Sequence, residues 1–188
     1  MRTTLFAAAT ATAALAFAGT ASAQDNPMVG GAPMMAEASI VENASNAPNL
    51  STLVAAVDAA GLVETLSGEG PFTVFAPTDA AFDRIADESL EMLLMPENQA
   101  TLQQILTCHV VGAEVFSPAL AGLIEDNGGV YPVETLGGCT LEAFMDGGEI
   151  MLRDPNGRVA TVETADVDQS NGVVHVIDAV LLPEGFAG

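Results

Sequence analysis

Histidine and cysteine are the rarest side chains in this sequence that could bind a metal ion or act as nucleophiles. The chain has two of each: His109 and His175, and Cys108 and Cys139. Two histidines without a free pair of cysteines make a poor ligand set for zinc. We therefore expect no metal site, and we interpret both histidines as hydrogen-bonded interior residues rather than as ligands.

Residues 166–172 place oxygen-bearing side chains at alternate positions, as calcium-binding loops do. The pattern fails where it matters most. Gly172 comes one position too late for the sharp turn of such a loop, and Ile177 occupies the place of the bidentate glutamate. We interpret the segment as a polar turn before the last strand.

Motifs of common catalytic sites are missing from the sequence. It has no G-x-S-x-G elbow, no H-E-x-x-H pair and no phosphate-binding loop. It has no lysine, which excludes Schiff-base chemistry. Close carboxylate pairs arise by chance among 25 acidic residues, so they are no evidence for acid–base catalysis. We expect no catalytic residue, no cofactor and no enzymatic activity.

The amino-terminal segment has the features of an export signal. Arg2 precedes an apolar stretch over residues 5–17, and Ala21-Ser22-Ala23 fits a signal-peptidase site. Residues 1–23 are therefore predicted to be a signal peptide, and the mature protein to be periplasmic or extracellular. No second apolar stretch is long enough to cross a bilayer, so stable membrane insertion is not expected.

In an exported chain the two cysteines are expected to form a disulfide, because an oxidising compartment favours such bonds. A bridge from Cys108 to Cys139 would close a loop of about 30 residues and contribute roughly 3–4 kcal/mol. Two free buried thiols, or pairing between molecules, are the alternatives that the spacing leaves open.

Helical patterns fill the first half of the chain. Leu50, Leu53, Val54 and Val57 share one face of a helix that Asn49 could cap. Short helices are also predicted over residues 62–66, 80–85, 87–94, 96–106 and, as a helical turn, 116–124. Before them, residues 24–37 contain two prolines and adjacent glycines, which predict an irregular arm, either a packed tail or a docking surface.

Strand patterns dominate the second half. Period-two segments separated by glycine-rich turns predict strands over residues 130–136, 139–145, 150–153, 158–163 and 173–182. Earlier strands are expected over residues 72–76, which Pro77 ends, and 107–111. Helices followed by hairpins indicate the α+β class and one domain, over residues 38–184.

Two segments resemble the paired signature boxes of the fasciclin domain. The first is Thr73-Val74-Phe75-Ala76-Pro77-Thr78-Asp79-Ala80-Ala81-Phe82, and the second is Asn171-Gly172-Val173-Val174-His175-Val176-Ile177-Asp178. Between them, Cys108-His109 stands where the family often has a Tyr-His pair. The resemblance implies a β-sandwich or wedge of about seven strands flanked by several short helices.

The resemblance also implies which residues matter and for what. The family's motif residues fall on Thr73, Phe75, Pro77, Thr78, Asp79, His109, Asn171, Gly172, His175 and Asp178, with structural rather than ligand-binding roles. Either Thr78 or Asp79 is expected to cap the helix that follows it. The ligand-binding residues are not identified by the sequence.

An adhesion or interaction module is the function that the resemblance implies. The expected partner is a protein or polysaccharide of the cell surface or extracellular matrix. We expect this protein to bind it as a monomer. The alternative is a carrier of an apolar molecule such as a carotenoid or lipid, as some relatives of this fold are. Met92, Met95, Met145 and Met151 favour that alternative, because methionine lines adaptable apolar surfaces.

Acidic residues outnumber basic ones by 25 to 4, which gives a net charge of −21. Such a surface repels nucleic acid and other polyanions, so nucleic-acid binding is not expected. A solvated acidic shell is typical of salt-adapted proteins. We therefore hypothesise a saline habitat.

Added salt is expected to stabilise the fold, because screening weakens the repulsion among the acidic side chains. Thermal unfolding followed between low and high NaCl concentration checks this. A melting temperature that does not rise with salt would refute the hypothesis.

Overall fold

The computed structural model describes residues 26–85 and 92–186. The predicted signal peptide lies outside these residues, as does most of the helix predicted over 87–94. The helices are α1 (Ile40–Asn46), α2 (Ser51–Ala60), α3 (Val63–Leu66), α4 (Asp79–Phe82), the 3₁₀ turn η1 (Pro96–Asn98), α6 (Gln99–Thr107) and α7 (Ser117–Asp126). The strands are β1 (Met28–Val29), β2 (Ala32–Pro33), β3 (Phe72–Pro77), β4 (Val110–Val111), β5 (Val130–Glu134), β6 (Thr140–Asp146), β7 (Glu149–Arg153), β8 (Val159–Gln169) and β9 (Gly172–Ile177).

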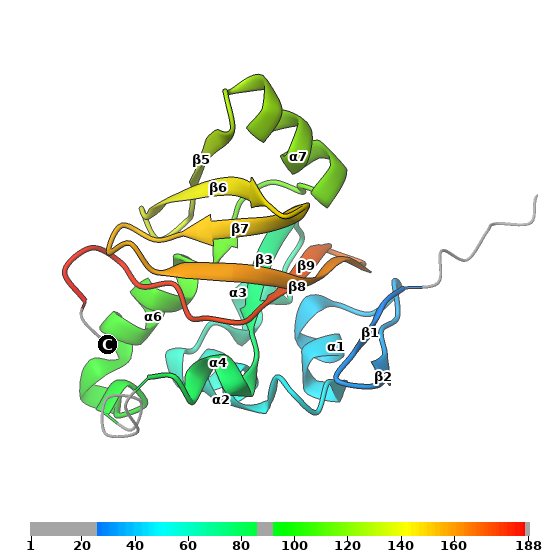
Figure 1. Ribbon diagram of the computed structural model, residues 1–188. Coiled ribbons are helices and arrows are strands. Elements are labelled where there is room, and N and C mark those ends of the chain that lie inside the picture. The colour runs from blue at the N-terminus through cyan, green and yellow to red at the C-terminus, as the bar shows by residue number, and fades with distance from the viewer. Residues whose placement is uncertain (1–25, 86–91, 187–188) are drawn as a thin grey trace, which may run out of the picture.

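Seven strands form one sheet in the order β4-β3-β9-β8-β7-β6-β5. β3 and β9 are parallel, and each of the other neighbouring pairs is antiparallel. β8 joins the two halves of the sheet: it pairs with β7 near its start and with β9 further along, where its register shifts twice. Such bulges bend a strand, and Figure 1 shows the sheet curling around β8.

Two hydrophobic cores lie on opposite faces of β3 and β9. Val74, Ala76, Val174 and Val176 belong to the core beneath the helices. Phe75 points the other way, into a core enclosed by β6, β7, β8 and α7. A central strand that is buried on both faces must be apolar on both, and β9 is buried at every position.

The curled sheet closes on itself at one end. Leu136 donates a backbone hydrogen bond to the carbonyl of Val110 (2.8 Å), and Gly137 donates to that of Thr107 (2.9 Å). These bonds join the chain after β5 to the opposite edge strand, β4. A disulfide between Cys108 and Cys139 crosses the same junction, with 5.3 Å between the Cα atoms. The structure thus has the intramolecular pairing that the sequence led us to expect.

Glycine is required at position 137 of this junction. A Cβ atom there would lie 2.6 Å from the backbone nitrogen of Cys108, and Cβ atoms of folded proteins do not approach other atoms so closely. The two edges can meet only because this residue has no side chain.

The predicted arm is more regular than its sequence suggested. β1 and β2 form a small antiparallel hairpin, and Gly30 and Gly31 supply the positive φ angles of its turn, 59° and 85°. The prediction of an irregular segment was wrong, because paired glycines that break longer strands are well suited to a two-residue hairpin turn. Val29 and Met34 are buried in the helical core, so the hairpin is packed against the domain.

Three element predictions need correction in the sheet. Residues 166–169 belong to β8 rather than to a polar turn, since the bulges let polar residues remain in the ladder. The last strand ends at Ile177, although Leu181 and Leu182 stay buried beyond it. The strand expected from Thr107 begins only at Val110, because α6 extends through Thr107.

The cap expected for α2 is also wrong. Leu50 precedes the helix, and Asn49 makes no capping bond; its side-chain oxygen is buried without a hydrogen-bond partner among the described residues. The amide of Thr52 instead donates to the carboxylate of Asp79 from a distant part of the chain (2.8 Å). A local sequence window could not reveal a cap supplied by tertiary structure.

Within residues 26–85 and 92–186, no helix combines the length and apolar character needed to cross a bilayer.

Candidate functional site

The polar residues of the first box bind other parts of the fold. The hydroxyl of Thr73 donates to the carbonyl of Ala113 (2.6 Å) and accepts from the amide of Val115 (2.9 Å). Thr78 caps α4 by accepting from the amide of Ala81 (3.3 Å). Pro77 is the last residue of β3.

Asp79 joins two helices. It lies in the first turn of α4, yet its carboxylate accepts bonds from the hydroxyl of Ser51 (2.7 Å) and the amide of Thr52 at the start of α2. Burial raises the pKa of Asp79, but these hydrogen bonds outweigh it and hold the pKa below the usual 3.8. The carboxylate is thus engaged within the fold.

Residues of the second box act at the entry to β9. Asn171 accepts from the amide of Ile40 at the start of α1 (3.1 Å) and donates to the carbonyls of Leu66 (2.7 Å) and Gly68 (3.0 Å). Gly172 follows with φ at 152°, and a Cβ there would lie 2.0 Å from the carbonyl oxygen of Phe72. Because glycine has no side chain, β9 can lie close enough to β3 to pair with it.

Asp178 holds the end of β9. Its carboxylate accepts from the amide of Thr161 on β8 (2.6 Å) and forms an ion pair with Arg84 (3.3 Å). The arginine is well exposed, so the ion pair adds little to stability and the amide bond is the more important contact.

His109 is fully enclosed and uses both ring nitrogens. Nδ1 donates to the carbonyl of Ile105 (2.8 Å), and Nε2 accepts from the amide of Leu181 (2.9 Å), which fixes the tautomer. Burial lowers the pKa of His109 to about 4, although the Ile105 carbonyl and the charge of Asp154 oppose the shift. Neither His109 nor the neighbouring Cys108 is accessible to a partner.

His175 makes an equivalent set of contacts on the opposite core. Its ring stacks on Phe75, with 5.7 Å between centroids, and its Nε2 donates to the carbonyl of Val115 (2.8 Å). Nδ1 accepts from the amide of Asp166 (3.2 Å). Burial lowers the pKa of His175, although the hydrogen bond to the Val115 carbonyl and the charge of Asp166 act to raise it. Both ring nitrogens are therefore engaged with the backbone.

Sequence reasoning missed several polar residues that are as central as the motif. Asp166 caps α7 from β8 by accepting from the amide (2.6 Å) and the hydroxyl of Ser117, in a strained backbone conformation with φ at 58°. Asp154 is 3% exposed and accepts from the amides of Asn156, Arg158 and Leu182. The first two of these bonds lie within the turn after β7, and the third joins that turn to the chain after β9.

Asn43 was missed as well. Its amide group exchanges hydrogen bonds with the backbone of Met35 and donates to the side chain of Gln169 (2.5 Å). It thereby joins the hairpin arm, α1 and β8. In the described residues, no three histidine, cysteine, aspartate or glutamate side chains gather as metal ligands would.

One of the clefts on the surface of the described residues lies where the two edges of the sheet separate. Beyond the Leu136–Val110 bond, the edges diverge and enclose a cleft of about 370 Å³, which we call the seam cleft. Its lining comes from β3 (Thr73, Phe75), from β4 and the chain after it (Val111, Ala113, Val115), from α7 (Leu120, Leu123) and from β5 (Tyr131, Pro132, Val133, Glu134). Figure 1 shows β5 and α7 together at one end of the molecule.

The β5 side of the seam cleft is an unpaired strand edge. Thr135 donates to the carbonyl of Cys139 on the β6 side. Because ladder bonds alternate along a strand, Pro132 and Glu134 direct their backbone groups to the opposite side, toward the cleft. Three exposed apolar residues lie within two positions of lining residues in the sequence: Phe116 (37% exposed), Val130 (41%) and Leu136 (54%).

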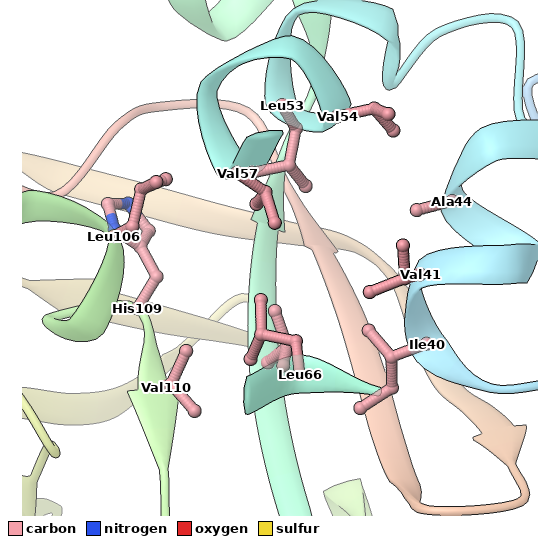
Figure 2. Close-up of a pocket in the computed structure, with 11 residues that line it drawn as sticks. Ile40, Val41, Ala44, Leu53, Val54, Val57, Leu66, Leu106, His109 and Val110 are labelled. Carbon is pink, nitrogen blue, oxygen red and sulfur yellow. The ribbon is translucent and has the colours of Figure 1, made fainter. Parts of the chain in front are cut away.

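A second cavity lies among the helices but is very small. Figure 2 shows Ile40, Val41 and Ala44 of α1 facing Leu53, Val54 and Val57 of α2, with His109 and Val110 on the other side. The cavity has a volume of about 30 Å³. That is about the share of liquid volume taken by one water molecule, so it is a packing gap in the helical core.

Acid is expected to destabilise the fold through His109. Above pH 6.5 the ring is neutral in both the folded and the unfolded state, and His109 contributes its full share to stability. Below pH 6.5 the unfolded chain takes up a proton on this ring, whereas the folded chain does so only near pH 4. The free energy of unfolding should fall by about 3 kcal/mol over this interval on account of His109 alone.

Denaturant unfolding at pH 7 and pH 4 measures this, with His109→Gln as the matched variant, since glutamine keeps a donor and an acceptor but does not titrate. The variant should lose less stability on acidification than the native chain. Equal losses in the two proteins would contradict the assignment.

Comparison with known proteins agrees with this architecture. The fasciclin domain profile matches residues 48–183. Protein sll1483 of Synechocystis is 46% identical over 144 residues, which cover 77% of this chain and 73% of that protein. Transforming growth factor-beta-induced protein ig-h3 of Sus scrofa is 35% identical over 134 residues, covering 71% of this chain but 18% of the relative.

A solved structure shares the fold. A FAS1 domain pair from the insect cell adhesion molecule fasciclin I superposes with a TM-score of 0.70 at 19% identity, covering 78% of this chain and 51% of that one. The α+β fold with a seven-stranded sheet and short flanking helices is therefore confirmed. The chain belongs to the fasciclin family.

Proposed function

We propose that this protein is an exported, non-enzymatic adhesion module, acting without a cofactor in the periplasm or outside the cell. The observation that carries the proposal is the seam: an open strand edge, with the exposed residues Phe116, Val130 and Leu136 close to its lining residues in the sequence, on a fold in which the motif residues are engaged internally. Apolar side chains around an unpaired edge are a common basis for recognition between macromolecules.

The relatives support this class of role. They include the cell adhesion molecule fasciclin I and the cell surface glycolipoprotein MPB83 of Mycobacterium bovis, which is 32% identical over 154 residues. The chain spans less than a fifth of ig-h3, so the activities of such longer relatives do not transfer whole.

The partner we propose is a protein or polysaccharide of the cell surface or matrix, bound by a monomer. The net charge of −21 favours a cationic partner, or one bridged by calcium, and disfavours nucleic acid. Carriage of a carotenoid or lipid has no specific observation in its favour, because Met92, Met95 and Met145 are exposed and the cavity among the helices holds about 30 Å³.

Binding to immobilised envelope or matrix fractions of the native source tests the proposal. Leu136→Glu and Val130→Glu should each weaken binding about tenfold or more, because a buried apolar contact is replaced by a charge. Val159→Glu is the matched control: its side chain is 40% exposed, and it lies on β8, which β7 and β6 separate from β5, so it should bind as the native chain does.

Two results would contradict the proposal. The native protein could bind nothing above background, or the control substitution could weaken binding as much as the two seam substitutions do. The second result would show that added negative charge, rather than the seam, governs the interaction.

A further inference from the structure

We propose that the seam cleft is a binding site for a small organic cation with an apolar body, such as an aromatic amine. This inference goes beyond the adhesive role and does not depend on it. At about 370 Å³, the cleft falls in the lower part of the size range of sites for small molecules.

Apolar side chains form the inner wall of the seam cleft. Phe75, Leu120 and Val133 are all buried, at 1%, 3% and 7% exposure, and they belong to the core enclosed by the curled sheet. The hydroxyl of Thr73 also reaches the cleft but is committed to Ala113 and Val115. The inner wall therefore suits the apolar body of a ligand and offers it no free polar partner.

The outer part of the seam cleft has a negative character. Glu134 is the one charged residue that lines it. The outward backbone carbonyls of Pro132 and Glu134 outnumber the outward N–H groups on the same edge, because Pro132 has no N–H and only Glu134 supplies one. An anionic head group would meet repulsion here, whereas an ammonium group would find acceptors.

Tyr131 adds a second feature that favours a cation. Its half-buried side chain lines the same cleft, and a phenol ring attracts ammonium groups through its negative face. Of the arginines in the described residues, Arg84 is paired with Asp178, Arg153 with Glu142, and none lines the cleft. The overall charge of −21 further raises the local concentration of cations.

Three probes with one shared phenyl body separate charge from apolar contact: 2-phenylethylammonium, 2-phenylethanol and 3-phenylpropanoate. They are titrated into the mature protein at about 0.15 M salt, where surface charge is screened beyond roughly 8 Å, and amide NMR shifts are followed. The cation should bind about tenfold more tightly than the alcohol. The carboxylate should bind most weakly, and shifts should cluster on β5, α7, the end of β4 and the chain after it.

Substitutions identify the origin of the preference. Glu134→Gln should remove most of the advantage of the cation over the alcohol, while Glu149→Gln, an exposed carboxylate of β7 outside the cleft, should leave it intact. Leu123→Trp should fill the cleft and abolish binding of all three probes. Should this bulky variant fail to fold, the two glutamine variants still decide the question.

Several results would overturn the proposal. They are the absence of saturable binding, equal affinity for cation and alcohol, an equal effect of Glu149→Gln and Glu134→Gln, and cation binding that survives in folded Leu123→Trp. The last two would indicate diffuse attraction to the acidic surface. Because no macromolecular partner is present in this assay, its failure leaves the adhesive role to its own test.

Discussion

The parallel pairing of β3 with β9 is the constraint on which the rest of the structure depends. The two strands run side by side from Phe72 and Gly172 to Pro77 and Ile177, although about a hundred residues separate them in the sequence. Each carries apolar side chains on both faces, so the pair divides the interior into two cores. The helices cover one core, and the curled sheet with α7 encloses the other.

Hydrogen bonds to half-buried or buried carboxylates, rather than ion pairs, fix the elements around this pair. The described residues contain two ion pairs, both with exposed partners, as expected of a chain with so few basic residues. Asp79, Asp154, Asp166 and Asp178 instead accept bonds from backbone amides. Such charge-assisted bonds are stronger than surface ion pairs, and salt screens them less where they are buried. An acidic chain without lysine can thus be rigid.

The sequence predicted the features that are encoded locally. The strand over residues 72–76, the helix face of Leu53 and Val57 and the hairpins of the second half follow from residue type and spacing, and the resemblance of the boxes supplied the fold. What it missed depends on contacts between distant segments. No local window shows that Asp79 caps α2, that Asp166 caps α7, or that bulges carry β8 through a polar stretch. The seam cleft was equally hidden, because its walls come from four elements.

We propose that partner binding takes place on the part of the surface that the motif residues do not occupy. The signature residues build the interior, and the seam between β4 and β5 remains open where the hydrogen bonds and the disulfide end. Amide hydrogen exchange tests the central claim most directly. The amides of Val74, Val174 and Val176 should exchange slowest, together and only through global unfolding, since both cores pack on their strands. If the β6–β7 hairpin kept its protection after those amides had exchanged, the β3–β9 pair would not be the foundation of the fold.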